Sequence, residues 1–464
     1  MSDASDPWTE PWGLTIADAG RALRDGSLTS ATLTESVLAR TDATEPTLNA
    51  FITRTDDLAR EQAAAADAEL EAGRDRGPLH GIPFALKDLY DTAGIPTTGG
   101  SGFLRDRVPD EDAFVVAKLK QAGIVLTGKL GLHEFAFGTT SNNPHFGAVH
   151  NPWNPDHSPG GSSGGSGAAI TAGSTLGTLG SDTGGSIRMP ASLCGCVGLM
   201  PTYGRVSRRG VLPLSWTLDH VGPLSRTVED AALVLNAIAG HDAADPGSTD
   251  VGVDDYTSQL GRDLRGLRVG LPRDPLWKDC QPAVEAANTE AVEVLRELGA
   301  TVQEVDLPLL AGSGRLSILT AEGLAYHAKW LDTQPEKYGD DVRNALELGR
   351  GVSAASYIND QRKRTLLIEE TSEVLRSVDV LVSPTTPITA PPIEGGDSQY
   401  QLARYTSPYD VTAIPAISLP CGFDHDGLPI GLMIGGRHFD EVTVLRVAHA
   451  FEQATDWHTQ RPPI

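Results

Sequence analysis

Two short stretches packed with glycine and serine limit what this chain can fold into more than any other feature. They are SPGGSSGGSGAAI at residues 158–170 and GSDTGGSIRMP at 180–190. Such stretches can be flexible linkers, phosphate-binding loops, or parts of an active site that holds serines on an unusual backbone. A linker has flanks of similar composition, whereas the first stretch runs directly into the apolar AAITAGSTLGTLG at 168–180. This context argues against a linker.

A phosphate-binding loop requires the pattern G-x-x-x-x-G-K-[ST], in which the final hydroxyl binds magnesium. The nearest match is GIVLTGKL at 123–130, where Leu130 stands in place of the hydroxyl and Val125 and Leu126 fill positions that belong to an open loop. We interpret this segment as a strand that ends in a turn. The remaining hypothesis for the two stretches is catalysis by serine.

The length and net charge of the chain indicate which classes of protein it can belong to. A chain of 464 residues, 40% of them hydrophobic, can bury a sizeable core. Its 61 acidic and 37 basic residues give a formal charge of -24, which repels nucleic acid and anionic membranes. No window approaches the roughly 18 apolar residues of a membrane span, and the acidic start MSDASDPWTEPW does not resemble a secretory signal. We therefore expect a cytoplasmic protein with no nucleic-acid or membrane partner.

The cysteines predict neither a disulfide framework nor a zinc site. Four cysteines are too few and too scattered for the first, and the C-x-C pair lacks the second ligand pair that a structural zinc site needs. We expect free thiols at Cys194, Cys196, Cys280 and Cys421.

The order of expected helices and strands is typical of an α/β fold, with one βαβ unit at 267–307. No repeat or low-complexity linker divides the sequence, so we expect one domain over 1–464 with a helical elaboration at about 316–378. Helices are expected at 29–41, 58–73, 113–123, 226–240, 282–300 and 441–454, and strands at 81–91, 124–130, 267–272, 301–307, 378–384, 415–421 and 429–436.

A serine hydroxyl is a weak nucleophile until a neighbouring base removes its proton. Histidine is the usual base, but no histidine near the two stretches lies in a recognisable catalytic motif. The alternative is a lysine kept neutral by burial, since desolvation lowers the pKa of lysine. Lys87 ends the apolar strand expected at 81–91 and fits that description. The histidines considered are His80, His133, His145, His150 and His157.

Several motifs resemble those of the amidase signature family of serine hydrolases. They are HGIPFALKD, FGTTSNNPHFGAVHNPWNPDHSPGGSSGGS, LGSDTGGSIRMPASLCGCVGL, PTYGRVSRRGVLPLSWTLDHVGPLSRTVEDAALVL and DGLPIGLMIGG, and the resemblance extends over about 14–463 with matching spacing. It implies a single-domain α/β/α sandwich, in which a large mixed central β-sheet is flanked by helices and the signature core covers about 70–240. It also implies a Ser-cisSer-Lys triad, which maps onto Ser186, Ser162 and Lys87.

The resemblance assigns further roles around this triad. A cis peptide between Gly161 and Ser162 would place the Ser162 hydroxyl between Lys87 and the nucleophile Ser186. No metal and no organic cofactor is implied. The backbone N–H groups expected to form the oxyanion hole belong to Thr183, Gly184, Gly185 and Ser186.

Other residues are expected to support the catalytic loop or to contact the substrate. Asp182 and Arg188 are expected to hold the loop around the nucleophile, and Ser163 to bind that loop rather than react. Relatives often have a lysine where this chain has Met200, which puts in doubt any contact that the lysine makes but leaves the triad untouched. The positions that match substrate contacts of relatives are Ala136, Phe137 and Gly138, although core packing explains the phenylalanine equally well.

The expected function is hydrolysis of a small carboxylic amide with an apolar or aryl portion, through a Ser186 acyl-enzyme that releases an acid and an amine or ammonia. One alternative keeps the mechanism and cleaves a carbamate, an ester or a urea-derived amide. A second is the glutaminase component of a tRNA-dependent amidotransferase, and a third is a non-catalytic binding protein, against which the intact triad argues. Whether the chain forms a homodimer is left open.

Overall fold

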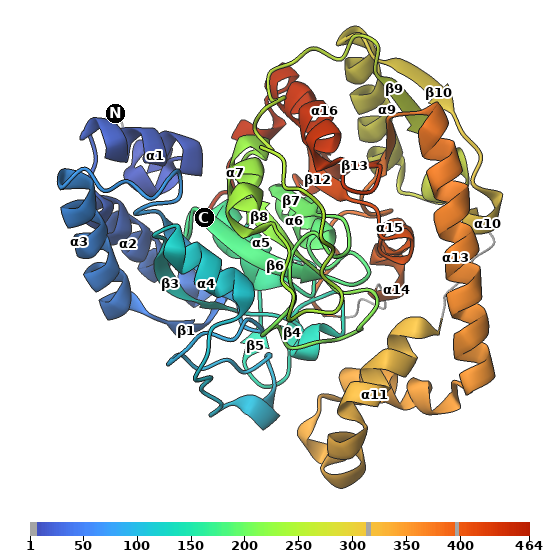
Figure 1. Cartoon of the computed structure of the whole chain (residues 1–464), viewed down its shortest axis with the longest axis horizontal. Coiled ribbons are helices and arrows are strands. Elements are labelled where there is room, and N and C mark those ends of the chain that lie inside the picture. The colour runs from blue at the N-terminus through green and yellow to red at the C-terminus, as the bar shows by residue number, and fades with distance from the viewer. Residues whose placement is uncertain (1–6, 312–316, 395–398) are drawn as a thin grey trace.

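In the described part of the chain, eleven strands form one mixed β-sheet that runs through the middle of the molecule (Figure 1). This computed structural model describes residues 7–311, 317–394 and 399–464. In spatial order the strands are β1 (Phe51–Arg54), β3 (Val125–Leu130), β2 (Pro83–Lys87), β6 (Gly177–Asp182), β8 (His220–Ser225), β7 (Val197–Met200), β12 (Ala416–Phe423), β13 (Pro429–Gly436), β11 (Val380–Pro384), β9 (Arg268–Leu271) and β10 (Thr301–Glu304). A separate short hairpin pairs β4 (Asn142–Asn143) with β5 (Gly147–Ala148).

The sheet combines parallel and antiparallel pairs. β2 lies parallel to both of its neighbours, β3 and β6. The strands from β6 through β8, β7, β12 and β13 to β11 pair antiparallel. At the far edge β9 and β10 are parallel and are joined by α9, which confirms the predicted βαβ unit. The prediction of an α/β fold with a large mixed central sheet is confirmed.

Helices pack on this sheet in two groups. α5 and α6 contact each other and pack on β2, β6, β7 and β12, while α7, α9 and α16 pack on β8 and on β11–β13. The apolar side chains between these layers make one large core. The helices outside residues 318–377 are α1 (Ile16–Asp25), α2 (Ser30–Leu48), α3 (Asp56–Glu71), α4 (Phe114–Gln121), α5 (Gly164–Ala172), α6 (Arg188–Cys194), α7 (Val228–Ile238), α8 (Arg273–Leu276), α9 (Pro282–Glu297), α10 (Pro308–Ala311), α14 (Gln399–Leu402), α15 (Ser407–Thr412) and α16 (Glu441–Ala454).

Residues 318–377, which we call the helical lobe, project from the sheet on the side away from the N-terminal helices (Figure 1). The lobe contains α11 (Ile318–Thr333), α12 (Asp340–Leu348) and α13 (Ala354–Ser377). α11 packs on α12 and α13, and α13 also packs on α15 near the end of the sheet. Part of the stretch expected as a helical elaboration, residue 316, lies outside the described residues.

The sequence analysis missed the short hairpin strands β4 and β5 and four strands of the central sheet, namely β1, β6, β7 and β8. β6 reads GTLGSD and β8 reads HVGPLS, so glycine, aspartate and proline occupy positions where strands usually carry β-branched or aromatic residues. All residues of β6, β7 and β8 are buried. Their conformation therefore comes from tertiary packing rather than from local preference.

The first glycine–serine stretch is not a linker, because residues 158–172 are buried and their second half forms α5. Its glycines allow close packing: a Cβ at Gly165 would lie 2.6 Å from the backbone N of Gly131. Segment 123–130 contains β3, as predicted. The four cysteines are free, and three of them are buried. Among the described helices we find none with the length and apolar character that crossing a membrane requires.

Candidate active site

Lys87 is the last residue of β2, and its side chain is fully buried. Its Nζ donates hydrogen bonds to the hydroxyl oxygens of Ser162 at 2.7 Å, Ser163 at 2.9 Å and Ser181 at 2.8 Å. An ammonium group has three donors, and three hydroxyls meet them here. The contact with Ser162 agrees with the sequence analysis, whereas the contact with Ser181 was not anticipated.

Burial lowers the pKa of Lys87 from 10.5 to about 7, against the opposing charges of Asp182 and Asp219. A substantial fraction of this lysine is therefore neutral at neutral pH. A neutral amine carries a lone pair, so Lys87 can accept a proton from a hydroxyl that it contacts.

Ser162 lies at the centre of the site. The peptide between Gly161 and Ser162 is cis, as the resemblance implies. The Ser162 carbonyl accepts hydrogen bonds from the His133 N–H at 3.1 Å and from the Ser141 hydroxyl at 3.3 Å. A Cβ at Gly161 would lie 2.7 Å from the backbone of Thr139 and Thr140, so only glycine fits beside this peptide. The surroundings thus fix the Ser162 backbone from two sides.

Ser186 lies two residues before the start of α6, and 6% of its surface is exposed. Its carbonyl accepts the Ser163 N–H at 3.2 Å, which joins the two glycine–serine stretches directly. In the described part of the chain no hydrogen bond connects the hydroxyls of Ser186 and Ser162. The structure therefore brings Lys87, Ser162 and Ser163 into direct contact and attaches Ser186 to them through its backbone.

Asp182 organises the loop that leads to Ser186. Its carboxylate accepts the backbone N–H groups of Gly185 at 2.5 Å, Ile187 at 3.1 Å and Arg188 at 3.4 Å. The Gly185 N–H, which was expected to line the oxyanion hole, is thus already occupied by this carboxylate. Within the described residues no such bond engages the N–H groups of Thr183, Gly184 and Ser186, so these three remain available to an oxyanion.

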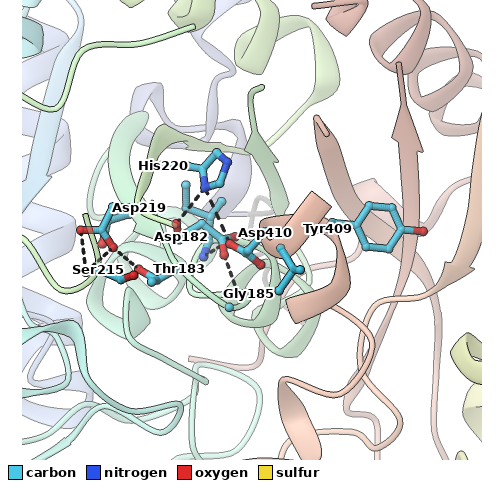
Figure 2. A network of polar contacts seen from close by, with 12 residues as sticks. Asp182, Thr183, Gly185, Ser215, Asp219, His220, Tyr409 and Asp410 are labelled. Carbon is cyan, nitrogen blue, oxygen red and sulfur yellow. Dashed lines mark hydrogen bonds and ion pairs between the residues drawn. The ribbon is translucent and has the colours of Figure 1, made fainter. Parts of the chain in front are cut away.

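A network of buried charges supports that loop (Figure 2). The Arg188 guanidinium binds the Asp182 carboxylate at 3.0 Å and the Asp410 carboxylate at 2.6 Å, and all three side chains are fully buried. Burial would raise the pKa of Asp182, but the charge and hydrogen bonds of Arg188 outweigh it and hold that pKa well below its usual range. Burial and the charge of Asp182 raise the pKa of Asp410 well above its usual range. Asp182 and Arg188 therefore contact the loop beside Ser186 and each other, and Asp410, which was not anticipated, joins them.

Asp219 and His220 were also missed by the sequence analysis. Asp219 accepts the Thr183 hydroxyl at 2.7 Å and the backbone N–H groups of Leu214 and Ser215, which connects the loop before Ser186 to the segment 208–216 (Figure 2). Burial raises the pKa of Asp219 to about 6 and lowers that of His220 to about 4. No sequence signal pointed to them, because β8, which begins at His220, was itself not predicted.

A cavity of about 280 Å³ adjoins this site. Segment 208–216 supplies half of the residues that line it, among them Val211, Leu212 and Leu214. Ser181 also lines it, and the Ser181 hydroxyl accepts a hydrogen bond from Lys87. The cavity therefore opens beside the lysine and has a largely apolar wall.

The charged groups of this cavity are already paired. Arg208 lies 3.2 Å from Asp245, and Arg209 lies 2.8 Å from Asp242. Asp219 accepts the Thr183 hydroxyl and two backbone N–H groups. A ligand that fills the cavity therefore meets apolar surface and neutralised ion pairs.

Of the three residues expected to contact substrate, Ala136 lines the cavity. Phe137 packs on the apolar cluster around Phe135, and Gly138 faces His133, whose Nε2 would lie 2.2 Å from a Cβ there. Phe135 and Ala136 have φ of 49° and 59°, a left-handed conformation that costs about 1–3 kcal/mol at a residue other than glycine. The surroundings of the segment 133–138 must therefore hold it in place.

Known proteins match this chain over most of its length. The sequence model of the Amidase family matches residues 32–445. The A component of the glutamyl-tRNA(Gln) amidotransferase of Chloroflexus aurantiacus is 43% identical, over 98% of this chain and 99% of its own length. Its name favours the amidotransferase alternative over the stand-alone amidohydrolase that the sequence analysis placed first.

Solved structures share the fold over nearly the whole chain. One was described in work on a vestigial protein complex and the origins of an s-triazine catabolic enzyme; it has a TM-score of 0.91 and 34% identity, covering 95% of this chain and 98% of its own. A bacterial aryl acylamidase of the amidase signature family has a TM-score of 0.88 and 27% identity, covering 97% and 99%.

Proposed function

This chain belongs to the Amidase family, whose members act on C–N bonds, and from that premise we propose that it hydrolyses a carboxylic amide with Ser186 as nucleophile and Ser162 and Lys87 as proton relay. The observation that carries the proposal is the fully buried Lys87, whose pKa of about 7 and 2.7 Å contact with Ser162 suit a general base. No other lysine of the described chain contacts a serine of either glycine–serine stretch.

In the proposed first step, neutral Lys87 accepts the Ser162 proton while Ser162 takes the proton of Ser186. The Ser186 Oγ forms a bond to the amide carbonyl carbon, and the oxyanion receives hydrogen bonds from the N–H groups of Thr183, Gly184 and Ser186. The C–N bond then breaks, and the leaving nitrogen takes the relayed proton through Ser162. Water activated by the same relay adds to the acyl-enzyme and releases the acid. The hydroxyls of Ser162 and Ser186 must approach for this, and catalytic hydrogen bonds often tighten only when substrate is bound.

The proposed substrate has an apolar or aryl acyl portion, which the cavity wall at 208–216 favours. Glutamine would need partners for its α-ammonium and α-carboxylate, and the arginines of this cavity already have carboxylate partners. Carbamates, esters and urea-derived amides present a similar carbonyl and belong to the same test.

The second candidate is the glutaminase component of a tRNA-dependent amidotransferase, and the 43% identity to a protein with an amidotransferase name favours it. Such a component would release ammonia to a partner rather than to solvent.

A substrate panel separates the two candidates. Purified protein is assayed with aryl and alkyl amides, carbamates, esters and glutamine, and a fluorophosphonate adduct is located by peptide mapping. We expect turnover of apolar amides and an adduct on Ser186. Turnover of glutamine alone would support the second candidate, and an adduct on another residue would overturn the assignment of the nucleophile.

A further inference from the structure

His133 links the serine loop to the helical lobe, and no step of the proposed reaction uses it. Its backbone N–H donates to the Ser162 carbonyl at 3.1 Å. Its imidazole Nε2 lies 2.9 Å from a carboxylate oxygen of Asp341, in the first turn of α12. One residue therefore contacts both the relay serine and the lobe.

The imidazole has little freedom to move. Only 1% of it is exposed, and its Nδ1 faces the Thr140 hydroxyl at 3.4 Å. On the other side Gly138 leaves the space that the ring fills, since a Cβ there would lie 2.2 Å from Nε2. The ring is thus held among Asp341, Thr140 and Gly138, which connects the place of His133 to that of Asp341.

The next residue, Glu134, makes a parallel connection. One of its carboxylate oxygens accepts the backbone N–H of Gly339 at 2.8 Å, immediately before α12. The other accepts the Ser101 hydroxyl at 2.6 Å and lies 2.9 Å from Nε2 of His145. Two consecutive residues thus attach the segment 133–138 to the start of α12.

We infer that His133 is a positioning residue through which the helical lobe sets the place of the Ser162 hydroxyl relative to Lys87. This inference rests on the proposed function of that relay. The Lys87–Ser162 distance of 2.7 Å depends on how the Ser162 backbone is held, and the His133 N–H is one of its two carbonyl donors. A misplacement of about 1 Å in catalytic geometry can lower a rate about 100-fold.

The test uses the variants His133→Ala, Asp341→Ala and the double variant, with kcat and the rate of fluorophosphonate labelling as readouts. Each single variant should lower both rates about tenfold or more. The double variant should be no slower than the slower single variant, because both remove the same link. His133→Gln keeps a side-chain donor and should restore part of the rate. Asp341 is 40% exposed, so its variant carries the test if His133→Ala does not fold.

His145→Gln is the matched control, because His145 also pairs with an acid of this segment but lacks the contact with Ser162. Its rates should stay within about twofold of the unmodified protein. Folded single variants that label at the unmodified rate, or single effects that multiply in the double variant, would overturn the inference. Absence of labelling at Ser186 in the unmodified protein would instead overturn the proposed function.

Discussion

The ion pairs beside the β-sheet at the site and those of the helical lobe differ in their exposure to solvent. Arg188 and its partner Asp182 are fully buried, whereas Arg350 and Asp332, a pair in the lobe, are 43% and 57% exposed. Buried ion pairs must be fully satisfied, while exposed pairs contribute little to stability. The buried pairs on the sheet side therefore fix the positions of the reacting groups. The surface residues of the lobe can be substituted at little cost in stability, while Asp341 still connects the lobe to the site.

The sharpest test of this division is the nucleophile itself. Ser186→Ala should lower kcat by at least about 10⁴-fold and abolish fluorophosphonate labelling, because it removes the attacking oxygen. The thermal unfolding midpoint should change little. Ser163→Ala is the control: Ser163 also lies beside Lys87, and its variant should still label. Retained labelling of the Ser186 variant would place the nucleophile elsewhere.

Removal of a buried cation should affect stability more than removal of an exposed one. Arg188→Ala leaves the carboxylates of Asp182 and Asp410 without their cation and should lower the free energy of unfolding by about 3–5 kcal/mol. Arg350→Ala should lower it by about 1 kcal/mol or less. Urea unfolding of both variants measures the difference, and equal losses would remove the contrast between the two regions.

The pH dependence of kcat/KM should report Lys87. Its pKa is lowered to about 7, and the neutral form is the base, so kcat/KM should rise with pH through about 7 and lose about tenfold per unit below it. Asp219 has a pKa of about 6 and is the competing explanation. The Asp219 charge raises the Lys87 pKa, so Asp219→Asn should move the rise to lower pH. Disappearance of the rise in that variant would assign it to Asp219.

The smallest effect is expected on the outer face of the lobe. Leu366 is 51% exposed on α13, so Leu366→Ser should change the free energy of unfolding by no more than about 0.5 kcal/mol. The buried Leu432 of β13 is the counterpart, and Leu432→Ala should lower that free energy by about 2–5 kcal/mol. A large loss at Leu366 would mean that this face is covered in solution.

The sequence predicts those elements that carry an amphipathic helical pattern or a run of large apolar side chains. The helix at 441–454 and the strand at 429–436 are observed with those bounds. The glycine- and proline-containing strands β6 and β8 could not be found in this way, because packing from both faces decides their conformation.

The residues of the site also divide into those that a local sequence pattern locates and those that it does not. Lys87, Ser162 and Ser186 come from motifs with fixed spacing, so a resemblance locates them. Asp410 and the contact of Asp341 with His133 depend on segments that lie more than 200 residues away along the chain. A local sequence pattern cannot predict such pairs, because only folding brings the two segments together.

The three hydroxyls around Lys87 have one further consequence. The ammonium form donates to all three, but the neutral amine has two hydrogens and a lone pair, so one hydroxyl must turn and donate to the nitrogen. The Ser163 hydroxyl already donates to the Ser181 carbonyl at 3.3 Å, which leaves those of Ser162 and Ser181 to reverse. The two protonation states thus share one set of heavy-atom positions and differ in the direction of their hydrogen bonds. Lys87 can therefore change its protonation state by the rotation of a single hydroxyl, with no movement of the chain.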